Sequence, residues 1–111
     1  GAGLLLGSDA PQVFNVPGFS VHQELELLVA AGLSPYEALL TGTANPAEFF
    51  GEAGESGIIA AGAGADFILL RGNPLESIGN TRSIDGVMLR GQWFDHAALE
   101  SMLAALEYPT Q

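Results

Sequence analysis

Leu4-Leu5-Leu6-Gly7-Ser8-Asp9-Ala10-Pro11 is the stretch of sequence that decides the predicted fold. Three consecutive leucines are typical of a strand that is buried on both faces, as in a parallel sheet. Asp9 follows almost directly, and parallel α/β barrels present catalytic acids at this end of a strand. The stretch therefore predicts an α/β fold with Asp9 as a candidate catalytic residue, although Ser-Asp-Ala-Pro would also suit a turn.

Helical signals follow, after a loop that is rich in proline and glycine. Ser20 is expected to begin the first helix. Ser34 is expected to begin the second, because Glu37 stands three residues later and the two side chains can form a capping box. A third, shorter helix is expected over about residues 45–51. Residues 1–51 thus form the first part of the predicted organisation: a strand, a loop and helices.

Residues 52–95 have an extended pattern, punctuated by glycines that mark turns. Three segments in this part are expected to be strands: Phe67–Leu70, Ile84–Leu89 and Gln92–Phe94. The first is apolar throughout and is predicted to be buried. The other two are predicted to form a hairpin around Arg90-Gly91. Residues 96–111 are expected to form a final amphipathic helix, capped by Asp95, and a tail.

Several motifs occur together in this order: Ser34-Pro35-Tyr36-Glu37-Ala38, Thr43-Ala44-Asn45-Pro46-Ala47 and Gly62-Ala63-Gly64-Ala65-Asp66. Together with the stretch around Asp9, they make the chain resemble the C-terminal part of metal-dependent amidohydrolases, in the imidazolonepropionase-like and prolidase-like branch. The resemblance implies the last strand and following helices of a (β/α)8 barrel, plus part of a small composite β-sandwich. It implies hydrolysis of a C–N bond in an amide, cyclic amide or dipeptide-type substrate.

The resemblance also implies roles for single residues. Asp9 matches the aspartate that binds the catalytic metal and acts as general base, and His22 and Glu24 match positions near the mouth of the active site, where they would contact substrate. His22 and Glu24 diverge by about 200° on a helix, so they cannot hold one ion between them. A solvated His22, and a Glu24 that only favours the positive end of the helix dipole, are the simpler alternatives.

Three other polar residues are expected to have structural roles. Asp66 is predicted to stabilise a turn at the entry to a strand. Arg82 is predicted to form an ion pair or a carbonyl contact, and His96 to be solvated near the start of the last helix. None of the three is expected to take part in catalysis.

Composition limits the possible partners. The chain has 111 residues and 13 acidic residues against three basic ones, which gives a net charge of −10. This charge disfavours nucleic acids and anionic membrane surfaces. There is no cysteine, no transmembrane run and no secretory signal, so the compartment stays open, with the cytoplasm favoured.

The chain cannot hold a complete metal site of the family, because it has only two histidines, not paired as His-x-His, and no lysine. Its length is about half of what a closed barrel needs. We therefore expect a C-terminal fragment of a longer parent, inactive and without tightly bound metal when isolated. The missing N-terminal portion would then be its natural partner, and a divalent metal, zinc by preference, would bind the full-length parent.

An alternative is a non-catalytic α/β module that acts through self-association or partner binding. The sequence is 48% hydrophobic, and its apolar strands would lack neighbours within so short a chain. A homodimer or higher oligomer is therefore expected for the isolated chain.

Overall fold

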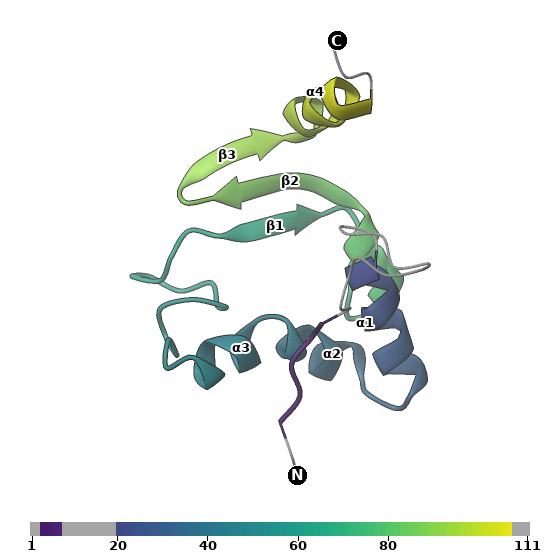
Figure 1. The fold of residues 1–111 in the computed structure, drawn as a ribbon, viewed down its shortest axis with the longest axis vertical. Helices are drawn as coiled ribbons and strands as arrows, with labels where there is room; N and C mark the ends of the chain where they lie inside the picture. Colours follow the sequence, from purple (N-terminus) through teal and green to yellow (C-terminus); the bar gives the residue numbers. More distant parts are fainter. Residues whose placement is uncertain (1–2, 8–19, 108–111) are drawn as a thin grey trace.

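The computed structural model describes residues 3–7 and 20–107, which form a mixed arrangement of helices and strands. Three helices lie together on one side of the molecule (Figure 1): α1 (Ser20–Ala30), α2 (Pro35–Thr41) and α3 (Ala44–Phe49). The predicted capping box is confirmed at the start of α2. The Ser34 hydroxyl accepts a hydrogen bond from the Glu37 N–H at 3.1 Å, and the Glu37 carboxylate accepts one from the Ser34 N–H at 2.9 Å.

An antiparallel sheet lies on the other side, with strand order β1-β2-β3 (Figure 1). Its strands are β1 (Phe67–Leu70), β2 (Ile84–Leu89) and β3 (Gln92–Asp95), so the three predicted strands are confirmed in place. The 3₁₀ helix η1 (Ile78–Arg82) precedes β2, and α4 (His96–Glu107) follows β3 and packs against β3 and β2. None of the helices in residues 20–107 is long and apolar enough to cross a membrane.

The predicted hairpin joins β2 to β3. Arg90 and Gly91 both have positive φ, 51° and 79°, as a type I′ turn requires. The Arg90 N–H donates to the Asp66 carboxylate at 2.8 Å, and the Gly91 N–H donates to the Ala65 carbonyl at 3.1 Å. Asp66 therefore stabilises a turn, as predicted, but the turn is the β2–β3 hairpin and not one at the entry to β1.

A small hydrophobic core lies where α1, α2 and η1 meet. Leu25, Ala38 and Ile78 are buried there, one from each element. Four partly buried residues pack around them: Leu6, Leu28, Val29 and Leu39. The core thus joins the helices to the connection that leads into the sheet.

The prediction of a buried strand at Leu4–Leu6 is wrong for this structure. The Leu6 N–H donates to the Thr41 carbonyl at the end of α2, at 2.8 Å, and the Leu4 carbonyl accepts from the Asn45 amide at 3.0 Å. Leu4 is 47% exposed. A strand needs an extended neighbour to complete its hydrogen bonds, and the backbone here bonds to helix ends instead.

The predicted burial of β1 is also wrong, although the strand itself is confirmed. Its first three residues are exposed, and the fourth is partly buried. Within the described ranges β1 pairs only with β2, so it forms one edge of the sheet. An apolar strand is buried only where another element packs against its faces.

Candidate functional site

The residue with the strongest sequence signal, Asp9, lies outside the described residues. The two predicted substrate contacts, His22 and Glu24, lie on α1, which begins at Ser20. Both are partly buried, and their positions two residues apart point them in different directions around the helix. The structure therefore does not bring His22 and Glu24 together.

His22 reaches across to η1. Its Nδ1 lies 3.0 Å from the Thr81 hydroxyl, a hydrogen bond in which either atom can donate, depending on the tautomer. The Thr81 residue is 4% exposed, so this contact lies at the edge of the interior. Burial is the main cause that lowers the pKa of His22 below its ordinary 6.5; the positive charge of Arg82 adds to this effect, and Glu26 opposes it.

Arg82 and Glu26 form a second link between the same elements. The Arg82 Nε donates to a carboxylate oxygen of Glu26 at 2.9 Å, and a terminal guanidinium nitrogen contacts the same oxygen. The predicted ion pair of Arg82 is thus confirmed. We call His22, Glu26, Thr81 and Arg82 the α1–η1 cluster. The bonded residues are 59 and 56 positions apart, so the sequence pointed to His22 and Arg82 separately without connecting them.

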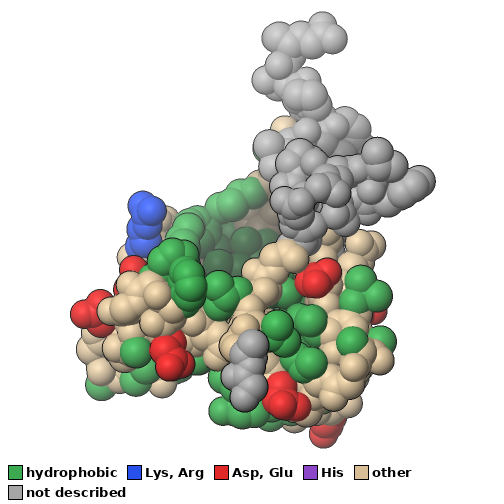
Figure 2. All heavy atoms as spheres, turned by 60° about the horizontal axis from the view of Figure 1, so that its bottom comes forward, with side chains coloured by type: hydrophobic (Ala, Val, Ile, Leu, Met, Phe, Trp, Pro, Cys, Tyr) green, Lys and Arg blue, Asp and Glu red, His purple; other side chains and the backbone are tan. Residues whose placement is uncertain are grey.

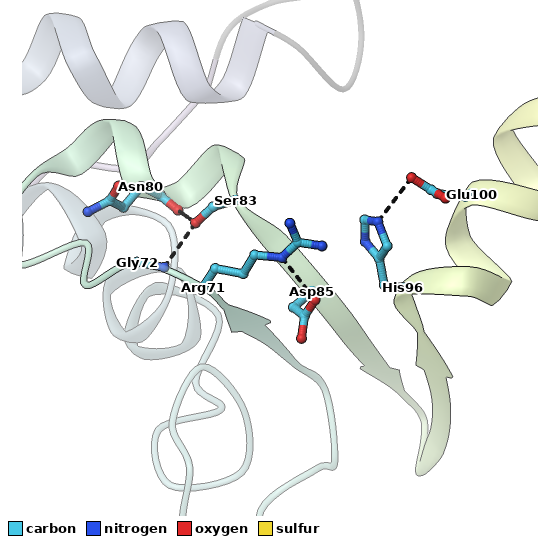
Figure 3. A network of polar contacts seen from close by, with 7 residues as sticks. All are labelled: Arg71, Gly72, Asn80, Ser83, Asp85, His96 and Glu100. Atoms are coloured by element: carbon cyan, nitrogen blue, oxygen red, sulfur yellow. Dashed lines mark hydrogen bonds and ion pairs between the residues drawn. The ribbon is translucent and has the colours of Figure 1, made fainter.

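Polar contacts around the end of the sheet are structural (Figure 3). Arg71, which follows β1, pairs with Asp85 of β2 at 3.0 Å. The Ser83 hydroxyl accepts from the Gly72 N–H at 3.1 Å. His96, predicted to be solvated, has a 42% exposed side chain and lies 3.0 Å from Glu100, one turn further along α4.

The described residues do not provide a metal centre. No group of three or more His, Cys, Asp or Glu side chains within residues 3–7 and 20–107 is arranged to hold an ion. A tightly bound catalytic metal needs at least three protein ligands.

A groove between the helices and the sheet is a feature that sequence analysis missed. It measures about 650 Å³ and lies between α2, the segment around Ile58-Ile59, and strands β1 and β2. Figure 2 shows hydrophobic side chains gathered around a hollow in this face of the molecule. Only one residue in its lining is charged, Asp66, and its carboxylate accepts from the Arg90 N–H. The apolar runs at Ile58-Ile59 and Phe67–Leu70 were the only sequence signal for it.

Comparison with known proteins gives the family context. The sequence model of the amidohydrolase family matches residues 1–94. Among solved structures, the chain is similar to molinate hydrolase, with 28% identity and a TM-score of 0.72 over 97% of this chain and 27% of that one. It is also similar to a structure described as an amidohydrolase, with 35% identity and a TM-score of 0.60 over 68% of this chain and 19% of that one.

A third similar structure is a prolidase in complex with N-methylphosphonate-L-proline, with 27% identity and a TM-score of 0.50 over 75% of this chain and 30% of that one. The chain therefore spans between about a fifth and a third of the length of these structures. No curated protein sequence is significantly similar to the chain.

Proposed function

Because this chain belongs to the amidohydrolase family, we propose that it is the C-terminal portion of a longer metal-dependent hydrolase that cleaves C–N bonds. The family match over residues 1–94 is the observation that carries this proposal. The similarity to a molinate hydrolase and to a prolidase supports a hydrolytic reaction. In this proposal Leu4–Leu6, which form no strand in this structure, would pair as the last barrel strand only beside strands of the longer protein. The loop and helices would follow up to residue 51, and residues 52–95 would supply strands of the small sandwich.

Asp9 is the proposed metal ligand and general base. A carboxylate in this role collects a proton from the attacking water and passes it to the leaving nitrogen. A divalent ion, zinc by preference, would supply Lewis-acid activation of the water. The described residues do not form a set of ligands that fits such an ion, so the other ligands would come from outside this chain.

His22 and Glu24 remain the proposed substrate contacts. Since Nδ1 of His22 faces Thr81, a contact between His22 and substrate would have to use Nε2. Glu24 is partly buried on the same helix. Its carboxylate would suit a substrate with an amine or amide N–H group.

The proposal is tested by Asp9→Asn in the longer enzyme. This variant keeps the volume of the side chain but removes its proton acceptor, so kcat should fall by at least the ~10²-fold typical of general acid–base groups. The longer enzyme would first be screened with zinc against dipeptides, N-acyl amino acids and cyclic amides, and kcat then measured on the best substrate.

Asp66→Asn is the matched control. It makes the same chemical change at a turn residue, and the amide oxygen still accepts from the Arg90 N–H, so kcat should stay near that of the unmodified enzyme. A near-normal kcat in Asp9→Asn would show that the assignment of Asp9 is wrong. The absence of any hydrolase activity, with the metal-loaded longer enzyme folded, would contradict the proposed function itself.

The groove favours one alternative, a non-catalytic module that associates with a second copy of itself. Its lining is apolar, with Asp66 as its only charged residue, whereas the whole chain carries a net charge of −10. Two copies that met along this groove would therefore bring few like charges together. A His-x-His motif in the coding sequence upstream of residue 1 would favour the enzyme, and a natural start codon directly before it would favour the module.

A further inference from the structure

The α1–η1 cluster lies at a junction between two parts of the fold. Figure 1 shows α1 beside the turn of η1 that leads into β2, and these two elements pack against each other. Three kinds of contact link them: Leu25 packs with Ile78, Glu26 pairs with Arg82, and His22 bonds to Thr81. Two of the three therefore depend on the charge or hydrogen bonding of polar side chains.

Thr81 connects this junction to the groove. It is buried, it lines the groove, and its hydroxyl is the partner of His22 Nδ1. Thr81 therefore lies between His22 and the groove.

We propose that the α1–η1 cluster is a pH-sensitive joint, in which protonation of the His22 imidazole loosens α1 from η1 and widens the groove beside Thr81. The neutral imidazole can accept the Thr81 hydroxyl proton or donate to the hydroxyl oxygen. The protonated imidazole can only donate, so the buried hydroxyl has to accept and its own proton loses His22 as an acceptor. The added charge also lies close to the guanidinium of Arg82.

Burial and the neighbouring charges together set the direction in which the pKa of His22 is shifted. α1 packs against η1 and α2; Arg82 of η1 opposes protonation of His22, and Glu26, one turn along α1, favours it. On α2, the titratable residues are Tyr36, which lines the groove, and Glu37, whose carboxylate is bound to the Ser34 N–H. Burial and the charge of Arg82 together outweigh Glu26, so the pKa of His22 lies below 6.5.

The lowered pKa of His22 determines how the stability of the joint changes with pH. A histidine with a lowered pKa in the folded state binds its proton less readily there than in the unfolded chain. The joint is therefore fully stable above about pH 6.5 and weakens as the pH falls through the folded-state pKa. Ordinary carboxyl groups stay mostly ionised above about pH 5, so between about pH 5 and pH 6.5 a change in stability reports mainly the protonation of histidine.

The first test measures the pKa of His22 directly. The imidazole C–H signals of the 111-residue chain are followed by NMR from pH 8 to pH 5, in buffer and in urea; only two histidines are present, and His96→Asn assigns them. We expect the pKa of His22 to be lower in the folded chain than in urea. An equal or higher folded-state pKa would overturn the proposal.

The second test asks whether His22 controls the junction. Amide hydrogen exchange in α1, corrected for the intrinsic effect of pH, should show protection that decreases as the pH falls below 6.5, together with increased binding of a dye for apolar surface. His22→Asn keeps an amide near the Nδ1 position but cannot take up the charge, so it should abolish this pH dependence. His96→Asn should leave it unchanged.

The variants Thr81→Val and Thr81→Ser distinguish the effect of the hydrogen bond between His22 and Thr81 from the effect of side-chain packing. Valine keeps the volume and removes the hydroxyl, so protection of α1 should be lost at high pH as well, and serine should restore it. An acid-induced loss of protection that persists in His22→Asn would refute the joint, and so would a Thr81→Val chain that behaves like the unmodified one. These readouts use no substrate, so the outcome is independent of the proposed hydrolase activity.

Discussion

Gly57 is the glycine at which, among those in the described residues, an added Cβ would come closest to other backbone atoms. Its φ is +73°, and a Cβ built on it would lie 2.2 Å from the Thr43 carbonyl oxygen. Gly62 has a similar φ of +88°, but a Cβ there would meet no atom within 4 Å. The two glycines therefore share one constraint, the positive φ, and differ in the second, the backbone contact with the start of α3.

This pair leads to a prediction at the scale of the residue. Gly62→Ala should cost about 1 kcal/mol of unfolding free energy, because only the positive φ is strained. Gly57→Ala should cost a further ~1–3 kcal/mol, because a rigid backbone atom must also move. Urea unfolding of both variants, followed by circular dichroism, checks the difference. Equal losses in the two variants would mean that the close approach at Gly57 does not constrain the chain.

The hairpin between β2 and β3 shows how an element can tolerate an unfavourable residue. Arg90 takes a φ of +51°, which costs a side-chain-bearing residue more than it would cost asparagine. The backbone N–H of Arg90 bonds to Asp66, and that of Gly91 to Ala65. The turn is therefore stabilised by backbone donors, and neither bond requires the arginine side chain.

Arg90→Asn should stabilise the chain by ~0.5–1 kcal/mol, because Asn-Gly is favoured in a type I′ turn and the N–H donor to Asp66 is kept. Arg90→Ala keeps the same donor without the preference for positive φ, so it is the control and should bring no gain. Thermal unfolding of the three proteins side by side gives the comparison. If alanine stabilised as much as asparagine, the strain at Arg90 would not be the cause.

At the scale of the whole molecule, the groove leaves much apolar surface uncovered. Ile59 is 83% exposed, and Phe67 and Ile68 of β1, which also line the groove, are 37% and 46% exposed. The edge of β1 away from β2 has no strand partner within the described residues. Exposed apolar side chains beside an open strand edge favour association.

We predict that the isolated chain is not a monomer, and that association uses the groove. Size exclusion with light scattering should give a mass above that of one chain, with an interface above roughly 2,000 Å² in total. Ile59→Glu, in the groove, should shift the mass towards one chain, because it would bury a charge. Leu103→Glu on α4, at a residue 66% exposed and outside the groove lining, is the control and should not.

A mass of one chain that is unchanged on dilution, without binding of a dye for apolar surface, would show that the chain covers its own groove. The prediction of self-association would then fail. An equal effect of Ile59→Glu and Leu103→Glu would instead contradict the choice of surface.

The sequence by itself determined the features that depend on a few neighbouring residues. The Ser34 capping box, the strand at Phe67–Leu70 and the Arg90-Gly91 hairpin follow from side chains or φ preferences within a few positions of each other, so their signals are complete in the sequence. Family membership was also predictable, because its motifs are contiguous.

The tertiary structure alone decided which residues meet across the chain. His22 and Thr81 are 59 positions apart, and Glu26 and Arg82 are 56 apart, so no local pattern connects them. The same reason explains the two wrong predictions of burial. The leucines at 4–6 and the apolar run of β1 are typical of buried strands, but a strand is buried only if another element packs over it. Only the arrangement of helices against the sheet decides that, and within residues 3–7 and 20–107 this arrangement leaves the groove uncovered.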